Sequence, residues 1–292
     1  MRPFRERLGM PGVIIADGAM GTMLFQRGLN PGECPERMNL DHPEVLEIIA
    51  GLYLSAGAEI IQTNTFGGSP MKLSSYGLEN KTEEINARAV RAVKKAVGDR
   101  AYVSASCGPS GKILQPYGDT SPEEMYSSFT KQLKVLITEG VDIICIETMT
   151  DINEAKLAVK AARSISSSIP VFATMTFDCT PRGFYTVMGT TVVQAAEGLA
   201  AAGADVVGSN CGNGILNMVK IAEEFTKHTA LPIIIQSNAG LPVLKDGMSV
   251  FPDSPEFMAE KSRDLKKIGV KIIGGCCGTT PEHIFAIKKA MG

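Results

Sequence analysis

The stretch AAGADVVGSNC at residues 201–211 contains the pattern that decides the fold. A segment of helical period reaches Gly203, and glycine commonly ends a helix because it adopts the left-handed conformation. Two β-branched valines follow and predict a short buried strand. The strand ends in the polar residues Asn210 and Cys211. The stretch therefore predicts the end of a helix, a tight joint and a buried strand with a polar end.

Similar joints, SAGAEII, TEGVDII and KIGVKII, precede three further apolar runs, so the chain contains a weak repeat of two strand-helix pairs. Short β-branched runs that end in small or polar residues predict eight strands in all. These are VIIADGA from Val13, EIIQTNTF from Glu59, YVSASCG from Tyr102, DIICIETM from Asp142, VFATMTF from Val171, DVVGSNC from Asp205, IIIQSNAG from Ile233 and KIIGGCCG from Lys271.

Segments of helical period lie between these strands, and helix caps predict where several of the helices begin. The caps are Ser121 with Pro122 and Glu124, Asp151 with Glu154, Thr191 with Gln194, and Thr280 with Pro281. Eight apolar strands that alternate with helices predict an α/β fold with a parallel sheet, closed into a (β/α)₈ TIM barrel. A doubly wound open sheet is the alternative. The barrel is favoured because the polar residues fall at the carboxyl end of every strand, where a barrel gathers its active-site loops.

The composition favours a small-molecule partner. Lys and Arg total 29 against 31 Asp and Glu, a net charge of -2, and no run of like charge predicts binding to nucleic acid or to a membrane surface. No apolar stretch has the length of a signal peptide or a membrane span, so we expect a cytoplasmic protein. No linker divides the chain, and we expect residues 1–292 to form a single domain.

Chemically useful residues end the predicted strands and should meet at the barrel mouth. They are Asp17, Asn64 with Thr65, Cys107, Glu147, Thr176 with Asp178, Asn210 with Cys211, Asn238, and Cys276 with Cys277. The sixth and eighth strands are two apart in a barrel, so Cys211 can reach the pair Cys276 and Cys277. Three thiolates around one point predict a zinc site with an open fourth position at the C-terminal mouth. A chance pair in a packed loop and a strained vicinal disulfide are the alternatives for Cys276 and Cys277.

The remaining cysteines and histidines have simpler interpretations. Cys107 and Cys145 are read as small buried hydrophobes, and Cys34 and Cys179 as thiols without a special role. The histidines are placed on or beside outer helices (His42 and His228) and at the surface or cap of the last helix (His283). A zinc ion with three thiolates is a poor Lewis acid for a carbonyl but readily holds one more sulfur, and a bound metal lowers the pKa of a thiol. The natural reaction is displacement at an electrophilic carbon by a substrate thiol.

Several motifs resemble those of one known family. They are DGAMGTML from Asp17, QTNTFGG from Gln62, CGPSGK from Cys107, ETMTD from Glu147, GSNCG from Gly208, SNAGLP from Ser237 and GGCCGTTPEH from Gly274. Over essentially the whole chain they are similar to the homocysteine-binding barrel of the homocysteine S-methyltransferases. The closest likeness is to the N-terminal module of the cobalamin-dependent methionine synthases.

The resemblance implies a zinc-dependent S-methyltransferase that methylates homocysteine, held as a zinc thiolate, to methionine. It implies that Cys211, Cys276 and Cys277 bind the zinc ion and that homocysteine supplies the fourth sulfur. It further implies that Asp17 and Glu147 hold the substrate's amino group and that the amides of Gly18 and Ala19 meet its carboxylate. These groups suit an amino acid, which needs anions for its ammonium and N–H donors for its carboxylate. Asn238 is implied as a ligand that caps the zinc ion when substrate is absent.

The chain also departs from its relatives. The corrinoid-binding pattern Asp-x-His-x-x-Gly is absent, because the Asp41 and His42 pair continues as Pro-Glu-Val, and Gln62 stands where many relatives have glutamate. We therefore expect methylcobalamin to be the methyl donor on a separate domain or corrinoid protein. Direct transfer from S-methylmethionine or betaine is an alternative, and so is action with a corrinoid protein on another methylated compound, methoxy or methylthio. A zinc store or redox sensor and a phosphate-binding aldolase barrel are more distant alternatives.

Overall fold

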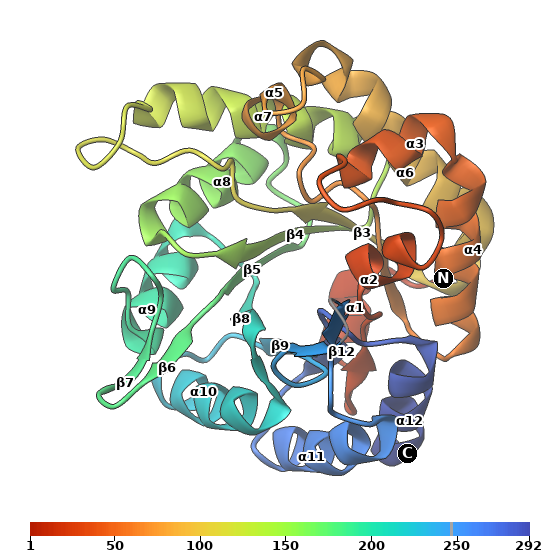
Figure 1. The fold of residues 1–292 in the computed structure, drawn as a ribbon. Coiled ribbons are helices and arrows are strands. Elements are labelled where there is room, and N and C mark those ends of the chain that lie inside the picture. The colour runs from red at the N-terminus through yellow and green to blue at the C-terminus, as the bar shows by residue number, and fades with distance from the viewer. Residues whose placement is uncertain (246–247) are drawn as a thin grey trace.

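The computed structural model describes residues 1–245 and 248–292 of the chain. In this part, eight parallel strands form one sheet in the order β1-β12-β9-β8-β5-β4-β3-β2, and a bridge between Ala16 and Ile60 joins the two edges. The sheet closes into the predicted barrel, and Figure 1 looks onto its mouth. The strands are β1 (Ile14–Ile15), β2 (Ile60–Gln62), β3 (Tyr102–Cys107), β4 (Ile143–Met149), β5 (Val171–Met175), β8 (Val206–Gly214), β9 (Ile233–Asn238) and β12 (Ile272–Gly275). That residues 1–292 form a single domain stays a prediction.

An outer helix follows each barrel strand and covers the sheet (Figure 1). These helices are α4 (Pro43–Ser55), α6 (Thr82–Val97), α7 (Pro122–Thr138), α8 (Ile152–Ile165), α9 (Val192–Ala202), α10 (Ile215–His228), α11 (Pro255–Lys267) and α12 (Pro281–Met291). Gly203 ends α9 in the left-handed conformation, as the opening stretch predicts. Among the described residues, no helix combines the length and apolar content needed to cross a bilayer.

The predicted helix caps are mostly confirmed. Ser121 and Thr191 form capping boxes with Glu124 and Gln194 at the starts of α7 and α9. Asp151 caps α8, but the prediction that Glu154 belongs to this cap is wrong. The carboxylate of Glu154 is buried and accepts hydrogen bonds from the backbone and hydroxyl of Ser110 instead. A tertiary contact therefore replaces the local one.

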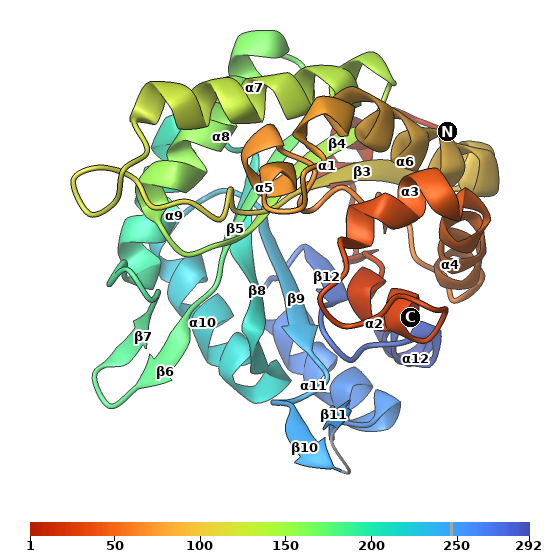
Figure 2. The same cartoon turned by 45° about the horizontal axis from the view of Figure 1, so that its top comes forward.

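Additional short elements lie in the loops at the mouth. The long loops after β1 and β2 contain α2 (Met20–Phe25), α3 (Met38–Asp41) and α5 (Pro70–Ser74). Two small antiparallel strand pairs that the sequence did not predict follow β5 and β9. They are the β6–β7 hairpin, formed by β6 (Asp178–Thr180) and β7 (Gly183–Tyr185), and the pair of β10 (Val243–Lys245) with β11 (Met248–Val250). Figure 2 shows both strand pairs standing away from the barrel wall. These insertions enlarge the face that carries the polar strand ends.

The opposite end of the barrel is closed by the N-terminal helix α1 (Phe4–Gly9). Phe4 is buried in the barrel interior, with its ring edge-on to Tyr102 at 4.9 Å and tilted against Phe172 at 5.4 Å. Aromatic contacts of this geometry add to the free energy gained by burial. The amino end of the barrel is thus a packed core, and the chemistry is left to the other end.

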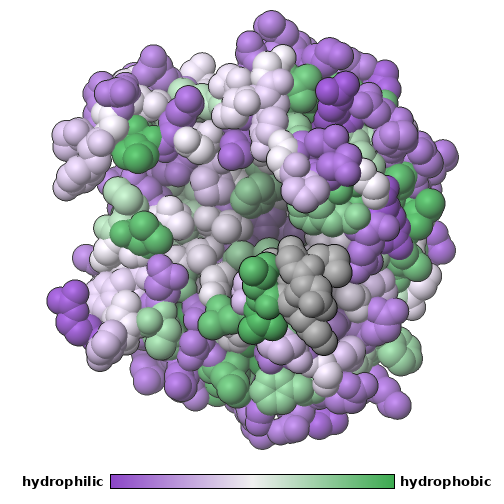
Figure 3. Space-filling model, viewed as in Figure 1, coloured by the Kyte–Doolittle hydropathy of each residue, from purple (hydrophilic) through white to green (hydrophobic). Residues whose placement is uncertain are grey.

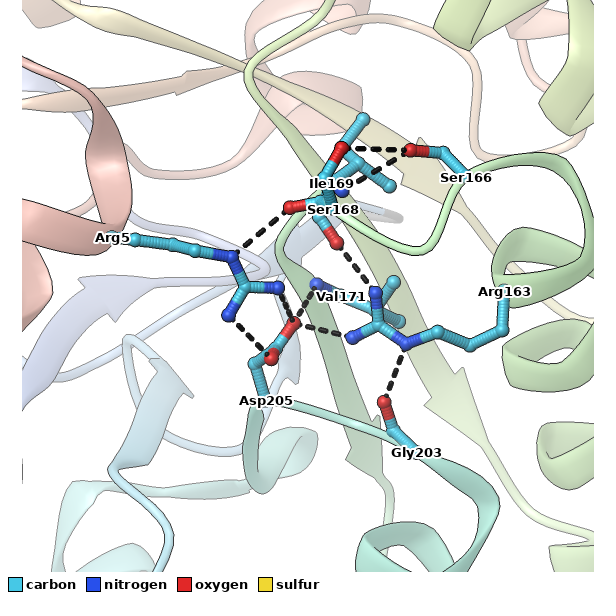
Figure 4. Close-up of polar contacts among 8 residues, drawn as sticks. All are labelled: Arg5, Arg163, Ser166, Ser168, Ile169, Val171, Gly203 and Asp205. Carbon is cyan, nitrogen blue, oxygen red and sulfur yellow. Dashed lines mark hydrogen bonds and ion pairs between the residues drawn. The ribbon is translucent and has the colours of Figure 1, made fainter.

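A charged network fastens α1 to this end of the barrel (Figure 4). Asp205, just before β8, accepts two hydrogen bonds from the guanidinium of Arg5, at 2.9 and 3.1 Å, and another from Arg163 of α8. It also accepts the N–H of Val171 at 2.8 Å, and Arg163 in turn donates to the carbonyl of Gly203 at 2.7 Å. One carboxylate therefore connects α1, α8, β5 and β8.

Replacing Asp205 with asparagine should lower the free energy of unfolding by about 2 kcal/mol, because hydrogen bonds to charged groups are stronger than neutral ones. Although burial opposes the effect, hydrogen bonds from Val171, Arg5 and Arg163 lower the pKa of Asp205. This stabilisation should therefore hold at neutral pH and be lost as the pH falls through that lowered value. Urea unfolding of both proteins between neutral and acid pH measures it. As a control, D264N removes an exposed pair with Lys267 and should cost less than about 1 kcal/mol.

Candidate metal and substrate site

Three cysteines meet at the barrel mouth. Cys211 lies in β8, and Cys276 and Cys277 follow β12, with only β9 between these two strands. The three sulfur atoms lie within 4.8 Å of one another, and those of Cys211 and Cys277 are 3.8 Å apart. The convergence predicted from the barrel order is therefore observed, across 65 positions of sequence between Cys211 and Cys276.

The backbone around the cysteines is held in place by neighbouring strands. The N–H of Cys276 donates to the carbonyl of Ser237 at 2.7 Å, and the carbonyl of Cys277 accepts the N–H of Ala239 at 2.9 Å. Gly278 has a φ of 80° and turns the chain toward α12. Cys211 has a φ of 59°, which is unusual for a residue with a side chain and costs about 1 kcal/mol or more.

The chemistry of the three side chains fits a zinc ion. Interactions with the thiols of Cys276 and Cys277 lower the pKa of Cys211, so the triad gives up a proton more readily than a lone thiol. The hydrogen bond to Cys211 also raises the pKa of Cys277, to about 11. Asn238 hydrogen-bonds to Cys211 as well, and its buried Oδ1 has no partner among the described residues. Three sulfurs at this spacing form a donor set that zinc accepts, and an amide oxygen beside them could complete it.

A cavity of about 240 Å³ opens beside the triad. It lies in the hollow at the centre of the face seen in Figure 3. Its lining includes all three cysteines, Gly18 to Thr22, Pro35, Glu36, Gln62, Phe66, Ser106, Glu147 and Thr148. This volume is below the usual range of about 300–1,000 Å³ for pockets that hold drug-sized ligands, and it suits a small molecule.

Glu147, at the end of β4, is one of two carboxyl groups in the cavity lining, and Glu36 is the other. The carboxylate of Glu147 accepts a hydrogen bond from the Ser106 hydroxyl, one from the Gln62 amide at 3.2 Å and one from the Asn210 amide at 3.4 Å. Burial raises the pKa of Glu147 to about 7. Gln62 therefore acts as a donor that fixes this carboxylate.

Asp17 lies behind the cavity wall, outside its lining. Its Oδ2 accepts the N–H of Gln62 at 2.7 Å, while its buried Oδ1 has no partner among the described residues. Burial, and secondarily the charge of Glu147, raises the pKa of Asp17 to about 8. No Lys or Arg in the described part of the chain forms an ion pair with Asp17 or Glu147. A cation near both carboxylates would relieve their repulsion.

Gly18 and Ala19 line the cavity, but the N–H of Ala19 already has a partner. Its N–H donates to the hydroxyl of Thr279 at 3.1 Å. A Cβ at Gly18 would lie 2.7 Å from that hydroxyl and 2.9 Å from the ring of Tyr53, so this close approach requires glycine. The contact of these two amides with a substrate carboxylate stays a prediction.

Two further residues lie near the site: Asn210, which was predicted at the mouth but was given no role, and Glu36, which was not predicted. Asn210 is fully buried and joins Glu147 to Thr148, donating to the Thr148 hydroxyl at 2.7 Å and accepting its N–H at 2.8 Å. Its place beside Cys211 at a strand end was the available signal. Glu36 lines the cavity and accepts the N–H of Gly67 at 2.6 Å. It lies in the short 3₁₀ helix Pro35–Arg37, which no sequence pattern marked.

The other cysteines and His283 are also placed. Cys107 and Cys145 are buried as predicted, and Cys179 is exposed. The thiol of Cys34 is buried and lies 3.3 Å from a carboxylate oxygen of Glu36. His283 does cap α12, as predicted, by accepting the N–H of Thr280, but it is buried rather than at the surface.

Solved structures share this fold. The homocysteine methyltransferase MmuM from Escherichia coli, in its metallated form, matches with a TM-score of 0.81 and 21% sequence identity, and the match covers 99% of both chains. Its apo form matches with a TM-score of 0.77 and 22% identity, over 99% of this chain and 100% of that one. At this level of identity the likeness shows the fold alone.

Sequence relatives include two methionine synthases. That of Mycobacterium leprae is 30% identical over 296 residues, and that of Mycobacterium tuberculosis is 31% identical over 297 residues. Each match covers 96% of this chain but only 24% of the relative, so the chain spans about a quarter of the length of these proteins. The family model described as homocysteine S-methyltransferase matches residues 14–291, nearly the whole chain. The chain therefore belongs to the homocysteine S-methyltransferase family of methyltransferases.

Proposed function

We propose that this barrel binds a zinc ion through Cys211, Cys276 and Cys277 and methylates homocysteine to methionine. The observation that carries the proposal is the position of the three sulfur atoms, which lie together on the wall of the cavity that also contains Glu147. A zinc ion held there would supply an open coordination position for the substrate sulfur and lower the pKa of its thiol. One small cavity thus offers sites for both ends of a thiol-containing amino acid.

The rest of the cavity suits the amino-acid end of homocysteine. Glu147, with its carboxylate oriented by Ser106 and Gln62, accepts the ammonium group. Burial raises the pKa of Asp17 behind it to about 8, and a bound ammonium group would favour the ionised form of this carboxyl. The amide of Gly18 receives the carboxylate, and that of Ala19 would join it by releasing the hydroxyl of Thr279. Asn238 caps the metal when the substrate is absent, which would give its free Oδ1 a partner. Fixed groups at both ends of the substrate orient its sulfur toward the methyl donor.

The surface around the mouth favours a methyl donor carried by a protein. Exposed apolar side chains lie on the segments that follow five of the barrel strands, and Figure 3 shows hydrophobic surface around the central hollow. These side chains are Phe66, Ile113, Tyr117, Val187, Met188, Leu216, Leu241, Val243, Leu244 and Val250. Exposed apolar surface of this kind is typical of contacts with another protein surface. We therefore propose methylcobalamin, held on a separate domain or corrinoid protein, as the donor.

A comparison of methyl donors tests the proposal. The zinc-loaded protein is given homocysteine with methylcobalamin, S-methylmethionine or betaine in separate reactions, and methionine is measured. We expect methylcobalamin to support the reaction and the other two to support little or none. Methionine from S-methylmethionine or betaine alone would instead establish direct transfer. If homocysteine leaves the zinc-sulfur spectrum unchanged, the substrate is another methylated compound and the proposed acceptor is wrong.

A further inference from the structure

Both ring nitrogens of the buried His283 have hydrogen-bond partners. Its Nδ1 accepts the N–H of Thr280 at 3.1 Å, at the start of α12, and its Nε2 lies 3.0 Å from the backbone oxygen of Asp253. Because a carbonyl only accepts hydrogen bonds, Nε2 must carry the hydrogen. The histidine thus connects α12 to the long loop between β9 and α11.

The contacts of His283 continue to a cysteine of the triad. The N–H of Asp253 donates to the carbonyl of Ala239 at 3.0 Å, and the N–H of Ala239 donates to the carbonyl of Cys277 at 2.9 Å. Thr280, which His283 holds through its other nitrogen, follows Cys277 closely in the sequence. These hydrogen bonds form a closed ring that leaves Cys277, passes through the loop after β9 and returns along the start of α12. We call this set of contacts the Cys277 ring.

Packing supports the Cys277 ring at two points. A Cβ on Gly278 would lie 2.1 Å from Cγ of Phe251, so the aromatic ring is seated directly on this glycine. A Cβ on Gly240 would lie 2.9 Å from the ring of Pro252. Neither glycine leaves room for a side chain, so Phe251 packs closely on the residue after the cysteine pair and Pro252 packs closely on Gly240.

We propose that His283 is a positioning residue that holds Cys277 in place for metal binding, acting through Asp253 and Ala239. The inference rests on the proposed function, because it requires a metal ion on the cysteine triad. Groups behind the ligands of a metal site commonly change metal affinity 10- to 100-fold when they are replaced. The hydrogen bonds from Asp253 to Ala239 and from Ala239 to Cys277 join backbone groups, which a substitution does not remove. The His283 side chain makes the other contacts of the Cys277 ring, so replacing it breaks the ring.

Two amide substitutions separate this role from simple helix capping. In H283N the side-chain oxygen can still accept the N–H of Thr280, but the shorter side chain does not reach Asp253. In H283Q the longer side chain reaches Asp253 with its NH₂ group, and glutamine at this helix position is also a normal capping residue. Each protein is loaded with Co²⁺, and the loss of its sulfur-to-cobalt absorption to a chelator is timed. We expect H283N to lose Co²⁺ at least about tenfold faster than H283Q.

Equal rates of loss from H283N and H283Q would overturn the inference and leave His283 as a helix cap only. S121A serves as the control for general destabilisation. It removes the cap of α7, which is remote in sequence from the three cysteines of the triad. It should lower the thermal stability without speeding Co²⁺ loss. Loss from S121A as fast as from H283N would also overturn the inference. Failure of the unsubstituted protein to bind Co²⁺ through sulfur would be a different result, because it would overturn the proposed zinc site itself.

Discussion

Replacing Cys277 with alanine is expected to abolish both stoichiometric zinc binding and methyl transfer. The substitution leaves only two of the three converging sulfur atoms. A catalytic zinc site needs three protein ligands, and two thiolates do not supply them. Zinc content by atomic absorption and methionine formation from homocysteine measure the two losses. Circular dichroism should show an intact barrel, because Cys277 lies in a loop outside the sheet.

The matched control is C179A. Cys179 is a free, exposed thiol on the β6–β7 hairpin, outside the cavity lining. This variant should keep zinc and activity, which separates loss of a ligand from loss of any cysteine. Wild-type zinc content or turnover in C277A would contradict the assignment of the triad.

Replacing Glu147 with glutamine is expected to lower kcat/KM for homocysteine at least about thirtyfold while zinc content stays unchanged. Removing one partner of a buried, hydrogen-bonded charge pair costs about 2 kcal/mol or more, which corresponds to this factor. Glutamine keeps the size of the side chain and can still hydrogen-bond to Ser106. The loss therefore reports the missing charge, and it should appear mainly as a higher KM.

An analogue without the amino group makes this prediction specific. The wild-type protein should use 4-mercaptobutyrate, which keeps the thiol and the carboxylate, much less efficiently than homocysteine. E147Q should discriminate little between the two thiols. The control E154Q changes another buried carboxylate, which Ser110 binds outside the cavity lining, and should keep the discrimination. If E147Q impairs both thiols equally, Glu147 does not bind the ammonium group.

The barrel could be predicted because its signals are local and repeated. Each unit carries its own helix end, joint and apolar strand, as Gly203 and the valines of β8 illustrate, and a parallel sheet of eight such units closes with few alternatives. The two antiparallel strand pairs were missed for the opposite reason. Strands of three residues, such as those on either side of Pro181 and Arg182, are shorter than the apolar runs that predict a barrel strand.

The site could be predicted where the order of the strands determines which residues lie close together. It could not be predicted where the contact depends on how individual side chains pack. The convergence of Cys211 with Cys276 follows from their strands alone. By contrast, the sequence pattern for Glu154 matched a helix cap, and its actual partner, Ser110, comes from a distant loop. In the same way, nothing near His283 in the sequence indicates its contact with Asp253. Such contacts depend on which polar groups are buried together, and this is settled only once the whole barrel has packed.

The left-handed backbone of Cys211 has an evolutionary consequence. Glycine adopts this conformation without the steric cost that a side chain carries, so a cysteine is kept here at the expense of backbone strain. Thr148, at the end of β4, has the same φ of 59° and is bound to the neighbouring Asn210. Both residues lie at the mouth, and the amino end of the barrel is packed around Phe4. Backbone strain therefore lies at the mouth, together with the cysteines, and the packed core lies at the amino end. Substitutions meant to stabilise the protein are best sought at the amino end, where they are least expected to reduce activity.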